Sequence, residues 1–199
     1  MQKAFFIKNM RINGKIYNNI LLVFALESEA GKEFDNFNKV FVGIGKVKAT
    51  YNLTKAIQKS NPDLIINLGT AGSTTFDRGS VVNCNQFIQR DMDVRALGFQ
   101  KFETPFSDEP ILLEYGSNIE NLPNGICGSG DQFEIEHINP EYNVIDMEAF
   151  ALAKVAELEG IDFLCLKYIS DDADGNAADD WTVEVKKASI ALKSELDKL

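Results

Sequence analysis

Short apolar runs alternate with amphipathic helical segments along most of this chain of 199 residues. The runs are rich in Val, Ile, Leu and Phe, which is typical of strands that are buried on both faces. Such strands, separated by helices, predict an α/β fold with helices on both faces of the sheet. The expected strands are residues 20–25, 40–44, 64–68, 81–88, 125–128, 144–147 and 163–169.

Three segments have the apolar spacing of a helix that packs on a core. The first should begin directly after Gly45 and end before Asn61. The second begins near Ala149 and ends at Gly160, where glycine suits a left-handed cap. The third carries its apolar residues over positions 185–199.

These elements predict one domain over residues 21–199, with three layers (α/β/α) around a mixed, largely parallel and twisted central sheet. Residues 1–20 stand before this pattern. Asn13 and Gly14 form a hairpin-type turn signal, so we expect residues 1–20 to be an N-terminal extension that adds a strand or hairpin.

The charge balance limits the partners. The chain has 30 acidic and 20 basic residues and a formal net charge of -10. This sign is wrong for neutralising nucleic-acid phosphates or for resting on an anionic membrane, and we exclude both as main partners. Since no apolar run approaches the ~18 residues of a spanning helix, and none near the start could form a signal peptide, we expect a cytoplasmic protein.

The cysteine and histidine counts limit the chemistry. Cys84, Cys127 and Cys165 are widely spaced and form no CxxC pair, which suggests neither a disulfide framework nor a zinc site. His137 is the single histidine and stands in a polar segment typical of a surface. A centre with two histidine ligands is therefore impossible. We expect no metal and no cofactor, and catalysis by carboxyl groups.

Acidic and small residues follow several of the expected strands. In α/β folds, ligands bind beyond the carboxyl ends of the strands, so these residues mark a pocket. Glu27 and Glu29 follow the first strand, and a run of glycine and small residues follows the third. The segments of this kind are residues 27–29, 69–73, 129–133, 146–148 and 170–175.

Seven segments, taken in their order along the chain, resemble the motifs of one enzyme family. They are residues 25–29 (ALESE), 42–47 (VGIGKV), 62–72 (PDLIINLGTAG), 93–98 (DVRALG), 129–133 (SGDQF), 147–149 (MEA) and 169–174 (ISDDAD). From about residue 20 to its C-terminus the chain thus resembles the nucleoside phosphorylase superfamily, and most closely the methylthioadenosine/S-adenosylhomocysteine nucleosidases. Residues 1–20 lie outside the resemblance.

The resemblance implies a purine nucleoside N-glycosidase that hydrolyses 5'-substituted adenosines to free adenine and a 5'-substituted ribose. Cleavage of this bond places positive charge on the sugar and negative charge on the purine, so it needs an acid at the base and a group that aims the nucleophile. By the resemblance, Asp171 protonates purine N7 and Glu29 positions and deprotonates the attacking water. Neighbouring Asp172 and Asp174 would help to hold the proton on Asp171.

The resemblance also assigns the substrate contacts. Glu148 would accept hydrogen bonds from the ribose hydroxyls, and Met147 would pack on the sugar. Phe133 would stack on the purine, the backbone of Glu134 would read its edge, and Trp181 would lie near the base or the 5' group. The remaining substrate-binding positions are Thr70, Ala71, Gly72 and Ser170.

Family members complete the 5' end of the pocket with a loop from a second subunit. Here that loop would be residues 94–105, with Leu97, Phe99 and Pro105 as its apolar contacts. The resemblance therefore implies a homodimer. It also implies two shortened segments beside the substrate site, a reduced helix at residues 111–122 and an abbreviated stretch at 134–146.

Two alternatives stay open. A phosphorylase would attack with phosphate, which proteins usually hold with arginine forks and amide nests. No arginine stands in residues 27–29 or 69–73, which favours water, although Lys46 and Lys48 keep phosphate possible. The other alternative is a catalytically inactive nucleoside-binding module, and the acids at Glu29, Glu148 and Asp171 argue against it.

Overall fold

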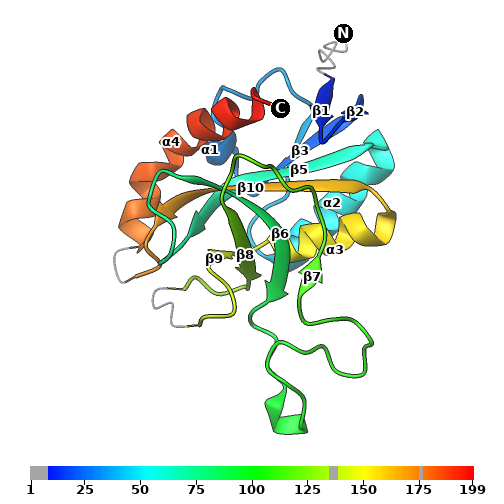
Figure 1. Ribbon diagram of the computed structural model, residues 1–199, viewed down its shortest axis with the longest axis vertical. Coiled ribbons are helices and arrows are strands. Elements are labelled where there is room, and N and C mark those ends of the chain that lie inside the picture. Colours follow the sequence, from blue (N-terminus) through cyan, green and yellow to red (C-terminus); the bar gives the residue numbers. More distant parts are fainter. Residues whose placement is uncertain (1–8, 135–138, 175–176) are drawn as a thin grey trace.

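Two helices lie on each face of a central sheet (Figure 1). The computed structural model describes residues 9–134, 139–174 and 177–199. Helices α1 (Glu27–Ala30) and α4 (Ala177–Leu196) cover one face, and α2 (Lys46–Ser60) and α3 (Ala149–Glu159) cover the other. Each face has its own buried apolar cluster. The predicted three-layer α/β fold is confirmed.

The sheet is mixed and largely parallel, as predicted. Its strand order is β10-β6-β8-β9-β5-β3-β4, with β7 beside β6. Strand β6 runs antiparallel to β10 and β7, and β9 antiparallel to β5, whereas the other neighbouring pairs are parallel. The strands are β3 (Ile20–Phe24), β4 (Lys39–Phe41), β5 (Leu64–Gly72), β6 (Val81–Gln89), β7 (Leu113–Glu114), β8 (Asn124–Ser129), β9 (Val144–Asp146) and β10 (Asp162–Asp171).

The sheet also closes on itself. Strand β10 pairs with β6 at one edge and with β5 at the other, so β10, β6, β8, β9 and β5 form a ring. Strands β3 and β4 extend this ring from β5. A closed ring brings the ends of all its strands around a single opening, which is why residues far apart in sequence share one cavity.

Two strands are longer than predicted. Residues 69–72 were expected to follow a strand, but they belong to β5, and Ser170 and Asp171 likewise belong to β10. The reason is that β5 and β10 pair in parallel as far as Gly72 and Asp171, with a register shift after Ile169. The hydrogen bonds between the two strands thus extend the sheet into the predicted loop.

The three predicted helices are confirmed. Helix α2 starts after Gly45 and ends at Ser60, before Asn61, and α3 ends at Glu159 and is capped by Gly160, which has the expected left-handed φ of 65°. The helix expected at residues 111–122 is wrong, because this segment contains the short strand β7 that pairs with β6. The short helices α1 and η1 (Arg95–Leu97) were not predicted.

The described part of the N-terminal extension forms a hairpin. Strands β1 (Met10–Ile12) and β2 (Lys15–Tyr17) are antiparallel around Asn13 and Gly14, both with positive φ. Lys15 Nζ and Tyr17 Oη donate hydrogen bonds to Asp162 at the start of β10, at 2.6 and 2.5 Å. The hairpin therefore covers the end of the ring opposite Asp171.

Three further observations concern the cysteines, the helices as membrane spans, and the side chains that could bind a metal ion. Cys84, Cys127 and Cys165 are free and buried. Among the described residues, no helix is long and apolar enough to cross a membrane, and no group of three His, Cys, Asp or Glu side chains is placed to hold a metal ion. His137, which we expect at the surface, lies outside the described residues.

Candidate active site

A cavity of about 390 Å³ lies beside the ends of β5, β9 and β10. It gathers every residue of the chain's own predicted catalytic and substrate-binding set. These are Glu29, Thr70, Ala71, Gly72, Phe133, Glu134, Met147, Glu148, Ser170, Asp171 and Trp181. The predicted partner residues Leu97, Phe99 and Pro105 are not among the residues that line it.

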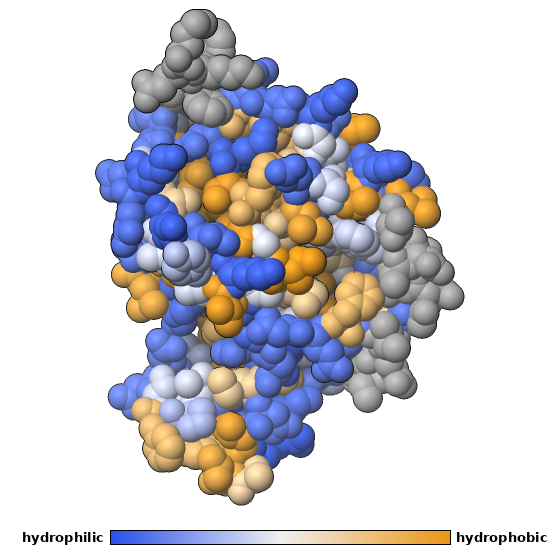
Figure 2. Space-filling model, turned by 180° about the vertical axis from the view of Figure 1, so that it is seen from behind, coloured by the Kyte–Doolittle hydropathy of each residue, from blue (hydrophilic) through white to orange (hydrophobic). Residues whose placement is uncertain are grey.

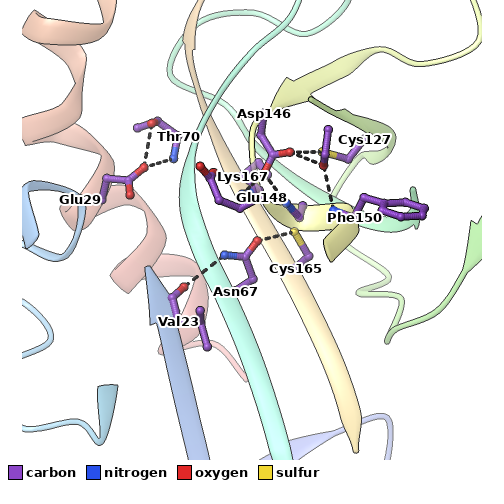
Figure 3. Close-up of polar contacts among 12 residues, drawn as sticks. Val23, Glu29, Asn67, Thr70, Cys127, Asp146, Glu148, Phe150, Cys165 and Lys167 are labelled. Atoms are coloured by element: carbon purple, nitrogen blue, oxygen red, sulfur yellow. Dashed lines mark hydrogen bonds and ion pairs between the residues drawn. The ribbon is translucent and has the colours of Figure 1, made fainter. Parts of the chain in front are cut away.

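Glu29 is buried at the cavity wall, and Figure 3 shows its contacts with Thr70. One of its carboxylate oxygens accepts hydrogen bonds from the backbone N–H and the hydroxyl of Thr70, both at 2.9 Å. The other oxygen accepts the N–H of Leu26 at 3.0 Å. Trp181 Nε1 donates to the Thr70 hydroxyl at 2.8 Å. The orientation of the Glu29 carboxylate is thus fixed before any ligand binds.

Asp171 ends β10 and is also buried. Its carboxylate accepts hydrogen bonds from the Ser170 hydroxyl at 2.8 Å and from the Ala173 N–H at 3.0 Å. A side chain at position 72 would place its Cβ 2.6 Å from an Asp171 oxygen. Glycine at position 72 therefore makes room for the carboxyl group beside β5.

The help expected from Asp172 is not supported. Its carboxylate forms an ion pair with Arg78, with 2.5 Å between the nearest nitrogen and oxygen, and it is half exposed. A paired and hydrated carboxylate repels its neighbour weakly. The environment of Asp171 is set mainly by its burial and by the hydrogen-bond donors of Ser170 and Ala173.

Glu148 is one of three buried ionisable side chains near the end of β9, together with Asp146 and Lys167. Its carboxyl oxygen accepts the Gly45 N–H at 2.8 Å. Burial, together with the nearby Asp146 carboxylate, raises the pKa of Glu148 to about 8. At neutral pH this carboxyl group is therefore mostly protonated, and it can both donate and accept hydrogen bonds.

Asp146 and Lys167 are the other two of these buried side chains. They make a buried ion pair of 2.8 Å, and Asp146 also accepts hydrogen bonds from the Ser129 hydroxyl and the Ala149 N–H. Burial alone would raise the pKa of Asp146 and lower that of Lys167. The opposite charge of the partner outweighs this effect of burial in both groups. The pKa of Asp146 is below its usual value and that of Lys167 well above. Both groups are ionised.

Sequence reasoning missed three groups at or beside the cavity. In the sequence, Asp146 is one of several acids that follow a strand, and Lys167 stands within an apolar strand. A lysine within a run of buried strand residues is the signal that could have identified it, since unpaired lysine is rarely buried. Arg90 was not assigned to the pocket, yet it lines the cavity and pairs with Glu134 at 3.0 Å.

The environment of Glu148 predicts a pH dependence of stability. The folded protein keeps the Glu148 proton up to about pH 8, whereas the unfolded chain releases it near the ordinary value of 4.5. The stabilisation is therefore full below the lower value and is lost as the pH rises through the upper one. Because Glu148→Gln cannot lose a proton, its unfolding free energy should fall less between about pH 5 and 9, by on the order of 2 to 4 kcal/mol.

Urea unfolding at several pH values measures this difference. The matched control is Glu27→Gln, which changes an exposed acid of α1. A Glu148→Gln variant with the pH profile of the unchanged protein would contradict the assignment.

Comparison with known proteins places this fold and cavity in a family. Residues 36–197 match the family model of the Phosphorylase superfamily. The chain belongs to this superfamily, which confirms the resemblance drawn from its motifs. Its relatives include the 5'-methylthioadenosine/S-adenosylhomocysteine nucleosidase of Staphylococcus saprophyticus, which is 30% identical over 79% of this chain and 78% of the relative.

Solved structures agree with this fold. The 5'-methylthioadenosine/S-adenosylhomocysteine nucleosidase of Helicobacter pylori superposes with a TM-score of 0.79, at 21% identity, over 90% of this chain and 98% of the other. The futalosine hydrolase of the same organism has a TM-score of 0.79 at 22% identity, over 90% and 97%. At this identity the two structures support the architecture alone.

Proposed function

We propose that this chain hydrolyses the N-glycosidic bond of 5'-substituted adenosines, such as 5'-methylthioadenosine, to adenine and a 5'-substituted ribose. One observation carries the proposal: Glu29, Glu148 and Asp171 line the same cavity although they belong to different parts of the chain. The names of the relatives agree with this substrate class.

The cavity has the groups that the reaction needs. Asp171 donates a proton to purine N7, so the leaving base departs without a full negative charge. Glu29, held by Thr70 and Leu26, orients a water molecule towards the anomeric carbon and accepts its proton. Glu148 binds the ribose hydroxyls, and Phe133 stacks on the purine.

The cations near the cavity favour water over phosphate. Arg90 is paired with Glu134 and Lys167 with Asp146, and all four side chains are largely buried. Lys46, one of the two lysines that keep phosphorolysis possible, is paired with Asp91, whereas the other, Lys48, is exposed on α2. A phosphate ion at Arg90, Lys167 or Lys46 would have to displace an acidic partner, which costs the energy of an established ion pair.

Product analysis tests hydrolysis directly. With 5'-methylthioadenosine as substrate, we expect adenine and free 5-methylthioribose at the same rate with and without phosphate. A phosphate-dependent rate with a ribose 1-phosphate product would establish a phosphorylase instead. Nucleoside that binds in calorimetry but is never cleaved would establish an inactive binding module.

We also propose that the enzyme is a homodimer in which residues 94–105 of each subunit complete the other's cavity. This segment belongs to a lobe that extends from the end of β6, and Figure 2 shows apolar surface on the same lower part of the molecule. Leu97 is 70% exposed there. Ile44 at the cavity and Val47 on α2 are exposed as well. A second subunit would cover these apolar surfaces.

A charged substitution in the lobe tests this assembly. Leu97→Asp should shift the sedimentation coefficient towards the monomer and raise KM for 5'-methylthioadenosine about tenfold, because one apolar contact is worth roughly 1–3 kcal/mol. The matched control is Ile190→Asp. Ile190 is 61% exposed and belongs to α4, which covers the face of the sheet opposite α2. A monomeric unchanged protein with full activity would contradict the proposal.

A further inference from the structure

Arg90 follows β6 directly, lines the cavity, and holds the loop of residues 130–134 through its guanidinium. Its side chain is only 6% exposed. One terminal nitrogen of its guanidinium pairs with the Glu134 carboxylate at 3.0 Å. The other donates to the Gln132 carbonyl and, at 3.5 Å, to the Gly130 carbonyl. A single side chain therefore contacts three residues of one short loop.

The loop is shaped to receive this guanidinium. A Cβ atom at position 130 would lie 3.0 Å from the Arg90 Cζ atom, so glycine lets the guanidinium lie against the backbone. The Tyr142 hydroxyl contacts both oxygens of the Glu134 carboxylate at 3.2 Å. Because this carboxylate is occupied by Arg90 and Tyr142, the part of Glu134 that remains for a ligand is its backbone.

The same loop carries the aromatic ring that faces the cavity. Phe133 is 47% exposed and belongs to no helix or strand. The first half of the loop is tied elsewhere, since Asp131 accepts the N–H of Lys46 at 2.7 Å and donates its own N–H to Asp91 at 2.8 Å. The second half, with Phe133 and Glu134, depends on Arg90 and Tyr142. The Gln132 carbonyl points at Arg90, so the N–H of the same peptide, at Phe133, points away from it.

We propose that Arg90 is a positioning residue for the purine: it holds Phe133 and the Glu134 backbone in the geometry that receives the base. This inference rests on the proposed function. An unanchored loop would have to be ordered each time a ligand binds, and that cost weakens binding of the base without changing the chemistry on the sugar. Arg90 thus acts through the loop and touches no reacting atom.

The test compares variants by KM and kcat separately. Arg90→Met keeps the length of the side chain but loses the guanidinium. It should raise KM about tenfold, keep kcat within roughly threefold, and weaken the binding of free adenine by the same factor as KM. Arg90→Lys should not rescue KM, because an ammonium group cannot contact a carboxylate and two carbonyls with the fixed fork of a guanidinium.

A control separates positioning from general destabilisation. Tyr17 belongs to the distant hairpin, and Tyr17→Phe removes its hydrogen bond to Asp162 of β10. This variant should have a lower Tm and an unchanged KM. If Arg90→Met does not fold, Glu134→Gln weakens the same ion pair and should raise KM in the same direction. An unchanged KM and unchanged adenine affinity in the folded variant overturn the proposal. If the unchanged protein releases no adenine, the proposed function fails, and adenine binding alone still tests Arg90.

Discussion

Asp171→Asn is expected to lower kcat for adenine release by about 10²- to 10⁴-fold, the range measured for a single general acid. Asparagine keeps the size of the side chain, and its amide oxygen can accept the Ala173 N–H while its NH₂ group donates to the Ser170 hydroxyl, which can accept as well as donate. It cannot deliver a proton to purine N7, so the base would leave as an anion. Binding of free adenine should remain within a few-fold, because the shape of the cavity does not change.

The neighbouring acid is the matched control for this variant. Asp172→Asn changes the same residue type one position away, but its carboxylate is paired with Arg78 at the surface. We expect less than about a threefold loss of kcat, since exposed ion pairs contribute little. Equal losses in the two variants, or full activity in Asp171→Asn, would contradict the role of Asp171 as the acid.

Glu29→Gln should lose at least about 10²-fold in kcat for a different reason. The amide has one accepting oxygen, whereas the carboxylate accepts from Thr70 on one side and from Leu26 on the other. In the variant an NH₂ group must face one of these donors, so the side chain loses its orientation as well as its basicity. Single-turnover measurement of 5-methylthioribose formation from 5'-methylthioadenosine reports this step.

Glu27→Gln, on the same short helix, is the control because Glu27 is exposed whereas Glu29 is buried. It should keep the activity of the unchanged protein. A loss of only twofold in Glu29→Gln would show that another group directs the water.

Much of the fold could be predicted from local pattern. The three long helices and the strands of the ring have apolar spacing that needs no knowledge of distant residues, and caps such as Gly160 mark their ends. The closure of the sheet could not be predicted, because the pairing of β10 with β5 joins residues about a hundred positions apart. Helix α1, with four residues, is too short to show a period.

The residues of the cavity could likewise be predicted only in part from local pattern. Residues such as Glu29 and Glu148 were found because they stand next to recognisable strands and motifs. Arg90 and Lys167 were missed because their meaning lies in their partners: Glu134 is 44 positions from Arg90, and Asp146 is 21 positions from Lys167. Ion pairs between segments that are distant in sequence leave no local pattern, although they set the charges of the site.

The most direct test of the central claim is a crystal structure of the Asp171→Asn variant with 5'-methylthioadenosine. We expect purine N7 within hydrogen-bond distance of residue 171, the ribose hydroxyls on Glu148, and a water molecule between Glu29 and the anomeric carbon. A nucleoside bound outside this cavity, or bound in it with its base away from residue 171, would contradict the account.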